Sequence, residues 1–347
     1  MFSKKTVKVK NIFIGGEHEI VIQSMTNTDT LDISSTLNQI NNLYELGAQL
    51  IRVSVRSLDD IESFRIICAS SKVPLCADIH FDYRVAVESI KAGASKIRLN
   101  PGNIGAEWKV REVVNTAREY GVPIRIGVNS GSIKKEFSYL ERYKALAESC
   151  LEELRILESM EFGDVVLSLK SSDAMETYNA NLYVAGKVDY PMHLGVTEAG
   201  VWEDSIILSS AGIGSLLFNK IGDTIRVSIS GDPLQEVTAA QKMLTLLGYL
   251  KGPRVIACPT CARTQIDVAE LAKKVKIMTA DIHQQITIAV MGCVVNGPGE
   301  AKDADIAVAG SGGAGVIFVK GKIVKKVERS NLEKELMDEI QKMICGR

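Results

Sequence analysis

The chain has 347 residues, of which 46% are hydrophobic and 24% are charged, and its formal net charge at pH 7 is -1. This composition excludes disordered and fibrous classes of protein. The near-zero charge argues against a broad nucleic-acid surface, although a local basic pocket for a small anion remains compatible with it.

The N-terminal residues 1–10 alternate lysines with apolar residues, so we expect no signal peptide. No later run of residues is long and apolar enough to predict a membrane span. We therefore expect a cytoplasmic protein. In that compartment seven cysteines are predicted to be thiols or metal ligands and not disulfides.

From Ile20 to Leu247 short apolar runs alternate with longer amphipathic segments, and glycines such as Gly47, Gly93 and Gly121 stand where a helix would stop. Helices are predicted between the runs, for example at Thr36–Leu46, Trp108–Tyr120 and Leu151–Met160. Eight βα units in this length predict a (β/α)8 TIM barrel over residues 1–250, with an open doubly wound sheet as the alternative. The predicted strands are Ile20–Ser24, Leu50–Val55, Leu75–Asp78, Lys96–Leu99, Ile124–Val128, Val165–Ser168, Met192–Gly195 and Thr224–Ser228.

The pattern changes after Lys251-Gly252-Pro253, which predicts a small α+β domain over residues 251–347. Its expected elements are a helix near Asp267–Lys274, a hairpin and a final helix at Asn331–Ile344. The glycine-rich segment 310–315 has the spacing of a dinucleotide fingerprint. Because it precedes an apolar strand and not a helix, we predict a turn there.

Polar residues follow the predicted barrel strands, where this fold carries its chemistry. Arg56, Arg98, Arg125 and Lys170 would place four cations around one mouth, in the company of Gly/Ser-rich loops that suit phosphate oxygens. Together they predict a polyanion site. Any one of these arginines could instead pair with a carboxylate on a neighbouring strand.

Two further side chains of the predicted mouth are candidates for function. His80, close to Asp78, is predicted to contact a substrate and not to act as a general base. Glu198 is the single acidic residue of its loop and would face cations, so we expect an acid or base role for it.

The C-terminal cysteines suggest a metal centre. Cys258 and Cys261 are two residues apart, Cys293 follows the apolar strand 286–291, and the next turn carries the carboxylate Glu300. Three soft ligands and a hard one favour an iron–sulfur cluster with one accessible iron. Zinc with His283 as the fourth ligand, or redox thiols, are the alternatives. The remaining cysteines lack ligand spacing and are predicted to be core or surface thiols: Cys68, Cys76, Cys150 and Cys345.

Five segments together resemble the bacterial 4-hydroxy-3-methylbut-2-enyl diphosphate synthases, the GcpE or IspG family. They are 21–27 (VIQSMTN), 77–82 (ADIHFD), 98–103 (RLNPGN), 125–132 (RIGVNSGS) and 292–300 (GCVVNGPGE). The resemblance covers nearly the whole chain, and the last segment is highly specific. It implies the two-domain bacterial form, a TIM barrel followed by a small α+β iron–sulfur domain.

The resemblance implies a 4Fe–4S cluster on Cys258, Cys261, Cys293 and Glu300. It implies a two-electron reductive dehydration that opens the ring of 2-C-methyl-D-erythritol 2,4-cyclodiphosphate and gives (E)-4-hydroxy-3-methylbut-2-enyl diphosphate, in the non-mevalonate isoprenoid pathway. Flavodoxin or ferredoxin would supply the electrons. The family also implies a homodimer, in which the cluster domain of one subunit closes over the barrel of the other.

Carried over by position, Glu198 would be the acid or orienting group at the departing hydroxyl, and Glu300 would yield its iron to a substrate oxygen. A non-catalytic iron–sulfur or zinc sensor of a phosphorylated ligand, or a zinc-dependent barrel hydrolase or aldolase, would be the rival functions. Glu300 favours the enzyme, since a sensor would more naturally use four inert ligands. The expected substrate contacts are Arg56, His80, Arg98, Asn100, Arg125, Asn129, Lys170 and Ser228.

Overall fold

The computed structural model describes residues 3–295, 299 and 302–345. The chain divides into two compact units, Met1–Met243 and Leu244–Arg347. The domain boundary that we predict between residues 250 and 251 lies between helix α9 (Pro233–Leu246) and strand β11 (Pro253–Ala257).

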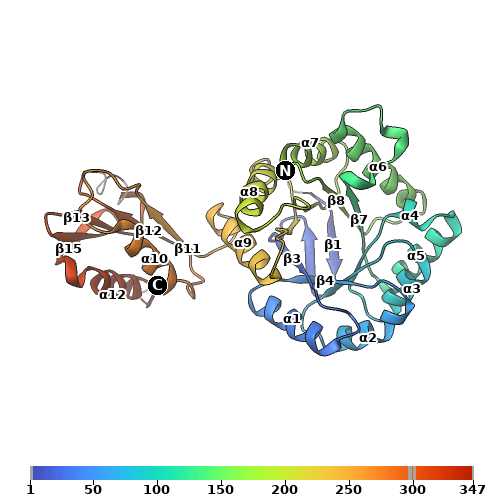
Figure 1. The fold of residues 1–347 in the computed structure, drawn as a ribbon, viewed down its shortest axis with the longest axis horizontal. Coiled ribbons are helices and arrows are strands. Elements are labelled where there is room, and N and C mark those ends of the chain that lie inside the picture. Colours follow the sequence, from blue (N-terminus) through green and yellow to red (C-terminus); the bar gives the residue numbers. More distant parts are fainter. Residues whose placement is uncertain (1–2, 296–298, 300–301, 346–347) are drawn as a thin grey trace. The chain divides into compact units, whose positions relative to one another are not determined.

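The first unit is a barrel of eight parallel strands surrounded by helices (Figure 1), and it confirms the predicted fold. The strand order is β8-β7-β6-β5-β4-β3-β10-β9. A parallel bridge between Leu167 and Met192, with a 2.8 Å hydrogen bond from the Leu167 amide to the Pro191 carbonyl, joins the two ends of this order. The strands are β3 (Val21–Met25), β4 (Leu50–Ser54), β5 (Leu75–Asp78), β6 (Lys96–Arg98), β7 (Ile124–Asn129), β8 (Val165–Lys170), β9 (His193–Leu194) and β10 (Thr224–Ile225).

The helices of this unit begin and end at residues suited to those positions. Asp32, Asp82 and Asp173 cap the helices that follow them by accepting a backbone N–H. The predicted helix stops are confirmed, because Gly47 and Gly93 adopt positive φ angles of 96° and 106° just past α1 and α3. The helices are α1 (Ile33–Glu45), α2 (Ile61–Ser70), α3 (Tyr83–Lys91), α4 (Pro101–Ile104), α5 (Glu107–Tyr120), α6 (Arg142–Ser159), α7 (Ala174–Ala185), α8 (Trp202–Phe218) and α9.

An N-terminal hairpin of β1 (Thr6–Val9) and β2 (Ile12–Gly15) closes the floor of the barrel. Its buried residues Val7, Val9 and Ile14 form one apolar cluster with barrel residues near the starts of their strands, among them Leu50 and Cys76. We do not predict this hairpin from the sequence. The alternation of lysine with valine that argues against a signal peptide is also the alternation of a half-buried strand.

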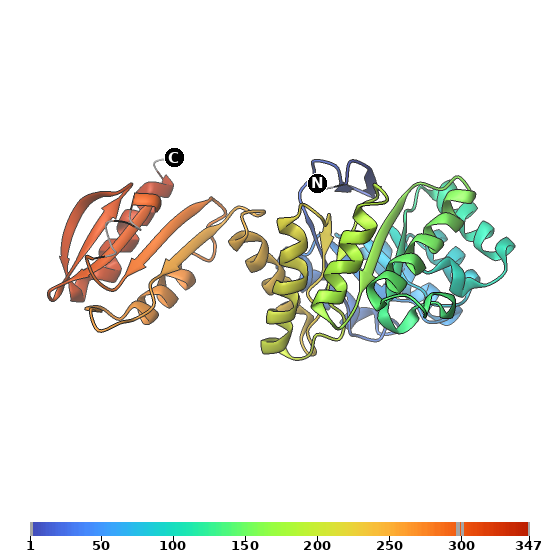
Figure 2. The ribbon, with the colours of Figure 1, turned by 90° about the horizontal axis from the view of Figure 1, so that it is seen from above.

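The second unit is a five-stranded mixed sheet with α10 (Val268–Met278) and α12 (Leu332–Cys345) on one face (Figure 2). Strands β11, β12 and β13 are parallel, and β13, β14 and β15 are antiparallel. The glycine-rich segment is the tight turn that we predict, because Gly312 and Gly313 have positive φ angles and join β13 to β14. The remaining strands are β12 (Ile286–Met291), β13 (Ile306–Ser311), β14 (Ala314–Val319) and β15 (Lys322–Glu328).

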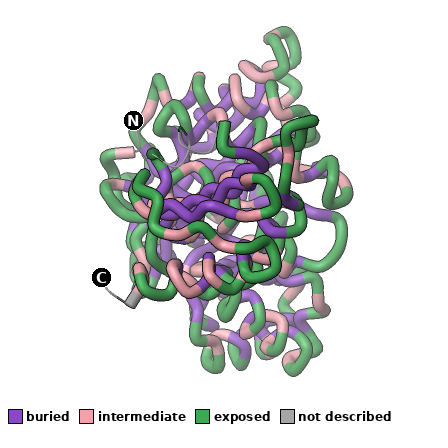
Figure 3. The backbone as a smooth tube through the Cα atoms, turned by 90° about the vertical axis from the view of Figure 1, so that its left-hand side faces the viewer, coloured by how far each residue is buried: buried purple, intermediate pink, exposed green. Residues whose placement is uncertain are grey.

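Buried segments follow the strands and exposed segments follow the loops and outer helix turns (Figure 3). In the part of the chain that the structure describes, no helix combines the length and the apolar character that a membrane crossing requires.

Candidate active site

Alternate residues of each barrel strand point inward, and residues paired in register on neighbouring parallel strands share that face. Cys76 packs on the floor hairpin, so its register partners Arg52 and Lys96 also face the interior. Two residues further along, Asp78 and Arg98 face it as well. The same count places six cations inside the barrel: Arg52, Lys96, Arg98, Arg125, Lys170 and Arg226.

Arg125 is the most deeply buried arginine of this set. It is only 2% exposed, and its Nε and Nη1 atoms have no hydrogen-bond partner among the described residues. Burial, and then the charge of Arg52, lowers the pKa of Arg125 to about 9, so the guanidinium remains charged at neutral pH. A buried charge without a partner is costly. A side chain of this kind is therefore suited to an anionic ligand.

Arg98 is the register partner of Arg125, and contacts with neighbouring residues fix its guanidinium. Its Nη2 donates to the Gly127 carbonyl at 2.9 Å and its Nη1 lies 3.1 Å from Nδ1 of His80, while Nε has no partner in the described part of the chain. Burial lowers the pKa of Arg98 from its ordinary value. Asn100 fixes the same region, because its Oδ1 accepts from the Gly127 amide at 2.9 Å.

Asp78 is the carboxylate nearest to these arginines. It lies 3.6 Å from Nη1 of Arg98 and 3.9 Å from Nη1 of Arg52. Burial pushes the pKa of Asp78 up, but Arg52, Arg98 and Arg125 pull it down further, and the net shift is below the ordinary value. One carboxylate cannot neutralise the three arginines that share it.

Lys170 and Arg226 are two more of the six cations inside the barrel. Burial, and then the charges of Arg125 and Arg226, lowers the pKa of Lys170 well below its ordinary value. Gly195 makes room for the ammonium, since a β-carbon at that position would lie 2.5 Å from Nζ of Lys170. Arg226, in contrast, is paired with Glu236 of α9 through two hydrogen bonds of 3.0 and 2.8 Å.

The other predicted substrate contacts differ in their surroundings. Asn129 ends β7 and is the register partner of Lys170. His80 is half-exposed, with Nε2 3.8 Å from Asp78. Ser228 is half-buried just beyond β10, and its carbonyl accepts from the Ser205 hydroxyl at 2.8 Å.

Arg56 differs from the inward cations. Its side chain is 53% exposed and contacts Asp29 at 2.7 Å and Asp60 at 2.9 Å. The hydrogen bond and charge of Asp60, and then those of Asp29, raise the pKa of Arg56. This is the pairing with a carboxylate that the sequence leaves open for each arginine. Its role as a substrate contact stays a prediction.

Glu198 lies on the exposed loop after β9 and has a positive φ of 52°. A left-handed backbone costs free energy for a residue with a β-carbon, and such conformations are concentrated at functional sites. No hydrogen bond of its carboxylate to another described residue is present, so the group is available to a ligand.

Four further residues of the barrel interior are not predicted from the sequence: Arg52, Lys96, Arg226 and Glu236. The signal for the first three is a cation at an inward position of an otherwise apolar strand, as in Leu50-Ile51-Arg52-Val53 and Lys96-Ile97-Arg98. Glu236 comes from a helix, and the strand pattern alone cannot place it.

Three cysteines lie at one edge of the second sheet. Cys258 and Cys293 follow the carboxyl ends of the neighbouring parallel strands β11 and β12, with Cys261 in the loop after Cys258. The Gly292 amide donates to Sγ of Cys258 at 3.1 Å. All three thiols are free, and the backbone N–H of Arg263 lowers the pKa of Cys261.

These thiols fit a cluster by donor chemistry and by their place on adjoining loops. Among the described residues, however, no three side chains of His, Cys, Asp or Glu already stand within ligating reach of one another. Glu300, the predicted fourth ligand, lies outside the described residues.

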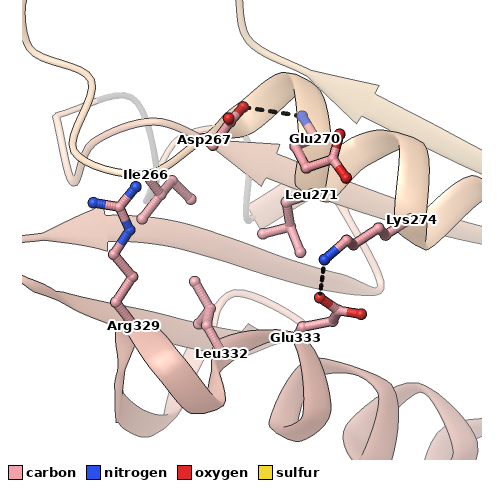
Figure 4. A pocket seen from close by; sticks show the side chains of 8 residues that line it. All are labelled: Ile266, Asp267, Glu270, Leu271, Lys274, Arg329, Leu332 and Glu333. Carbon is pink, nitrogen blue, oxygen red and sulfur yellow. Dashed lines mark hydrogen bonds and ion pairs between the residues drawn. The ribbon is translucent and has the colours of Figure 1, made fainter.

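A separate pocket of about 130 Å³ lies between α10 and the start of α12 in the second unit (Figure 4). Lys274 and Glu333 form a 2.7 Å ion pair at this pocket, and the apolar side chains of Leu271 and Leu332 also line it. It has charges of both signs but no isolated cation cluster, so it does not resemble the barrel interior. Its lining residues are Ile266, Asp267, Glu270, Leu271, Lys274, Arg329, Leu332 and Glu333.

Comparison with solved structures supports the barrel. Residues of this chain superpose on dihydropteroate synthase from Stenotrophomonas maltophilia with a TM-score of 0.53 and 14% identity, over 70% of this chain and 97% of that one. A Yersinia pestis dihydropteroate synthase gives 0.51 and 13%, over 70% and 98%. At such identities the likeness concerns the fold alone.

Sequence comparison is more specific. The chain is 51% identical over 346 residues to the 4-hydroxy-3-methylbut-2-en-1-yl diphosphate synthase (flavodoxin) of Caldanaerobacter subterraneus subsp. tengcongensis, covering 98% of this chain and 97% of the relative. It is 50% identical to the enzyme of that name from Thermotoga maritima, covering 98% and 100%. Residues 4–241 match the GcpE TIM-barrel domain and residues 254–342 match the GcpE protein C-terminal domain. The resemblance of the five motifs is thus confirmed, and this chain belongs to the GcpE family.

Proposed function

We propose that this chain is a flavodoxin-dependent 4-hydroxy-3-methylbut-2-enyl diphosphate synthase, an oxidoreductase of the non-mevalonate isoprenoid pathway. It opens the ring of 2-C-methyl-D-erythritol 2,4-cyclodiphosphate by a two-electron reductive dehydration. The full-length relatives of that name support this function. The structural observation that carries it is the buried guanidinium of Arg125, one of six inward cations, whose Nε and Nη1 have no hydrogen-bond partner among the described residues.

The barrel cations bind the diphosphate in this proposal. Arg125 and Lys170 form no ion pair with any carboxylate of the described residues, so they are available to phosphate oxygens. Arg98 and Asn100 are already oriented through Gly127, and such preorganisation lowers the free-energy cost of binding. Asn129, Ser228 and His80 would complete the contacts to the diphosphate or the diol.

Glu198 would donate a proton to, or orient, the departing hydroxyl. Its loop follows β9, the neighbour in the barrel of the strand that carries Lys170, so in this proposal the carboxylate would lie at the rim of the cation site. General acid catalysis requires a titratable group within hydrogen-bond reach of the leaving oxygen.

Cys258, Cys261 and Cys293, together with Glu300, would hold a 4Fe–4S cluster. A cluster of this kind supplies single electrons, and a carboxylate ligand leaves one iron exchangeable. The Gly292 amide that donates to Cys258 is the type of contact that tunes a thiolate ligand. Flavodoxin, or ferredoxin, would be the electron donor.

A homodimer is the proposed assembly, and the outer face of α7 and α8 is the surface that we propose for it. The segment from Ser205 to Phe218 has no charged residue, and Ile207 and Phe218 are 68% and 69% exposed. Between the two helices lies a groove of about 500 Å³ that is lined by Met175 among others. Both copies present the same exposed apolar side chains and the same groove, so a two-fold symmetric pairing of this surface would be self-complementary.

Two experiments test these proposals. Protein isolated anaerobically should contain iron and labile sulfide and should convert the cyclodiphosphate when reduced flavodoxin is present. Binding of the cyclodiphosphate without turnover would indicate a sensor, and zinc without sulfide would contradict the cluster.

The dimer surface is tested by sedimentation. Phe218→Glu should give a monomer, whereas Ile66→Glu, which changes an exposed apolar residue of α2, should not. Equal behaviour of the two variants would reject this face.

A further inference from the structure

Beneath the mouth cations the barrel contains a second polar layer. Lys96 begins β6 two residues before Arg98, so its side chain faces the interior about 6.6 Å closer to the floor. The side chain is fully buried, and Nζ donates to Oε1 of Gln23 at 3.2 Å. Below this layer, Val7, Val9 and Ile14 of the hairpin close the barrel.

The charged and titratable groups that face Lys96 come from the surrounding strands. They are Arg52 of β4, Cys76 of β5, Arg125 of β7 and His193 of β9. None of these is a carboxylate, and burial raises the pKa of the Cys76 thiol, which keeps it neutral. His193 is fully buried, and the burial together with the charge of Lys170 lowers its pKa well below the ordinary value. Lys96 therefore faces cations and neutral groups alone within the described part of the chain.

We propose that Lys96 is a positioning residue that takes up a proton when the diphosphate binds above it, so that the buried layer supplies an additional positive charge only in the complex. This inference rests on the proposed function, because it requires a dianionic ligand at Arg98 and Arg125. Each phosphorus of the cyclodiphosphate carries one acidic hydroxyl that is ionised at neutral pH. The proton must therefore come from solvent and be bound by the protein.

Burial lowers the pKa of Lys96 to about 7, and the charges of Arg125 and Arg52 act in the same direction. In the free protein the amine is thus mostly neutral above pH 7. Two negative charges above it oppose the repulsion of the arginines and raise its pKa. By linkage, affinity for the diphosphate should fall as the pH rises above 7, by up to about tenfold per pH unit for one proton.

The test is calorimetric titration of the cluster-loaded protein with the cyclodiphosphate at pH 8, without an electron donor, in Tris and in HEPES. These buffers differ in ionisation enthalpy. In the wild type the observed binding enthalpies should differ by an amount that corresponds to nearly one proton taken up. Lys96→Met removes the titratable amine and keeps a side chain of similar length, so we expect it to fold. It should bind several-fold more weakly at pH 7, with no dependence on buffer.

Two controls make the result specific. Lys96→Arg retains a permanent charge, so it should bind without proton uptake, and Cys76→Ala, in the same layer, should leave the uptake unchanged. Buffer-independent enthalpies in the wild type would overturn the inference while leaving the proposed function intact. Uptake that persists in Lys96→Met but disappears in His193→Gln would assign the proton to His193. Failure of the wild type to bind the cyclodiphosphate would reject the proposed function itself.

Discussion

Gly127 and Arg98 are in direct contact across neighbouring strands. The Gly127 carbonyl accepts from Nη2 of Arg98 at 2.9 Å, and a β-carbon at position 127 would lie 2.7 Å from Nε. The glycine therefore leaves the space that the guanidinium of Arg98 occupies beside the strand. Because the contact atom belongs to the side chain that we expect to bind phosphate, the substitution of Gly127 tests the geometry of the site.

Gly127→Ala should displace Arg98 and weaken binding of the cyclodiphosphate. The expected loss is that of one charge-assisted contact, roughly 1.5–3 kcal/mol, or about 10- to 150-fold in Kd. Gly163→Ala is the matched control, since a β-carbon there would meet no atom within 4 Å and Gly163 lies before β8, away from the strand ends that carry the cations. Calorimetric Kd values for both variants would check this, and an unchanged Kd for Gly127→Ala would contradict the assignment of Arg98.

Arg125→Met should abolish most of the affinity for the diphosphate, while Arg56→Met should have the smaller effect. Arg125 is buried with two unpartnered donors among the described residues, whereas Arg56 already binds Asp29 and Asp60. For Arg125→Met we expect a loss of about 1.5–3 kcal/mol per contact removed. The same variant should unfold at an equal or higher temperature, because it eliminates an unpaired buried charge. A larger loss of affinity in Arg56→Met would place the phosphate site at the rim.

Cys258→Ala should lower the iron and sulfide content of anaerobically isolated protein, and Cys76→Ala should not. Cys258 accepts a backbone N–H at the sheet edge, but Cys76 is fully buried in the barrel on the floor hairpin. Glu300→Ala should also destabilise the cluster, and Glu300→Cys should retain it without activity, since thiolate holds iron more firmly than carboxylate. Metal analysis and low-temperature EPR of the reduced protein measure this. An active Glu300→Cys enzyme would show that exchange at this ligand is unnecessary.

Glu198→Gln should reduce turnover by about 10²- to 10⁴-fold, the usual contribution of general acid–base catalysis. Iron content and affinity for the cyclodiphosphate should remain as in the wild type, because the amide keeps the shape of the side chain. Glu203→Gln, at an exposed position in the first turn of α8, is the control. Product formation with reduced flavodoxin is the assay, and near-normal activity would remove Glu198 from the mechanism.

Asp223→Asn should stabilise the barrel at neutral and alkaline pH. Burial raises the pKa of Asp223 to about 6, although the Met192 amide and the Ser3 hydroxyl donate to it. A carboxyl whose pKa is raised on folding lowers the free energy of unfolding as the pH rises from its unfolded value of 3.8 to about 6. The cost above that range is at most roughly 3 kcal/mol. Denaturant unfolding at pH 4 and pH 8 should show the difference between the two proteins at pH 8 alone.

The sequence predicts the strands of the barrel closely, because each is a short apolar run bounded by polar residues. The orientation of individual side chains is harder to predict from the sequence. Arg52 lies within the apolar run 50–55 and Arg56 directly follows it. Because β4 ends at Ser54, Arg52 faces the interior while Arg56 meets Asp29 and Asp60. The role of Glu236 could not be predicted from the sequence. Glu236 lies in helix α9, and only the folded barrel brings it into contact with Arg226, which follows strand β10. The cysteine spacing predicts a metal centre, but the sequence does not show that Cys258 and Cys293 follow neighbouring parallel strands, which only the pairing of β11 with β12 places side by side.

The hairpin of β1 and β2 closes one end of the barrel, so the interior is reached from the other end. Val7, Val9 and Ile14 are buried against the strand starts, so every molecule that reaches Gln23 or Lys96 has to enter and leave past Arg98 and Arg125. A diphosphate bound by those arginines then blocks access to the interior. Exchange of protons and water with the layer below should be fast in the free protein and slow in the complex.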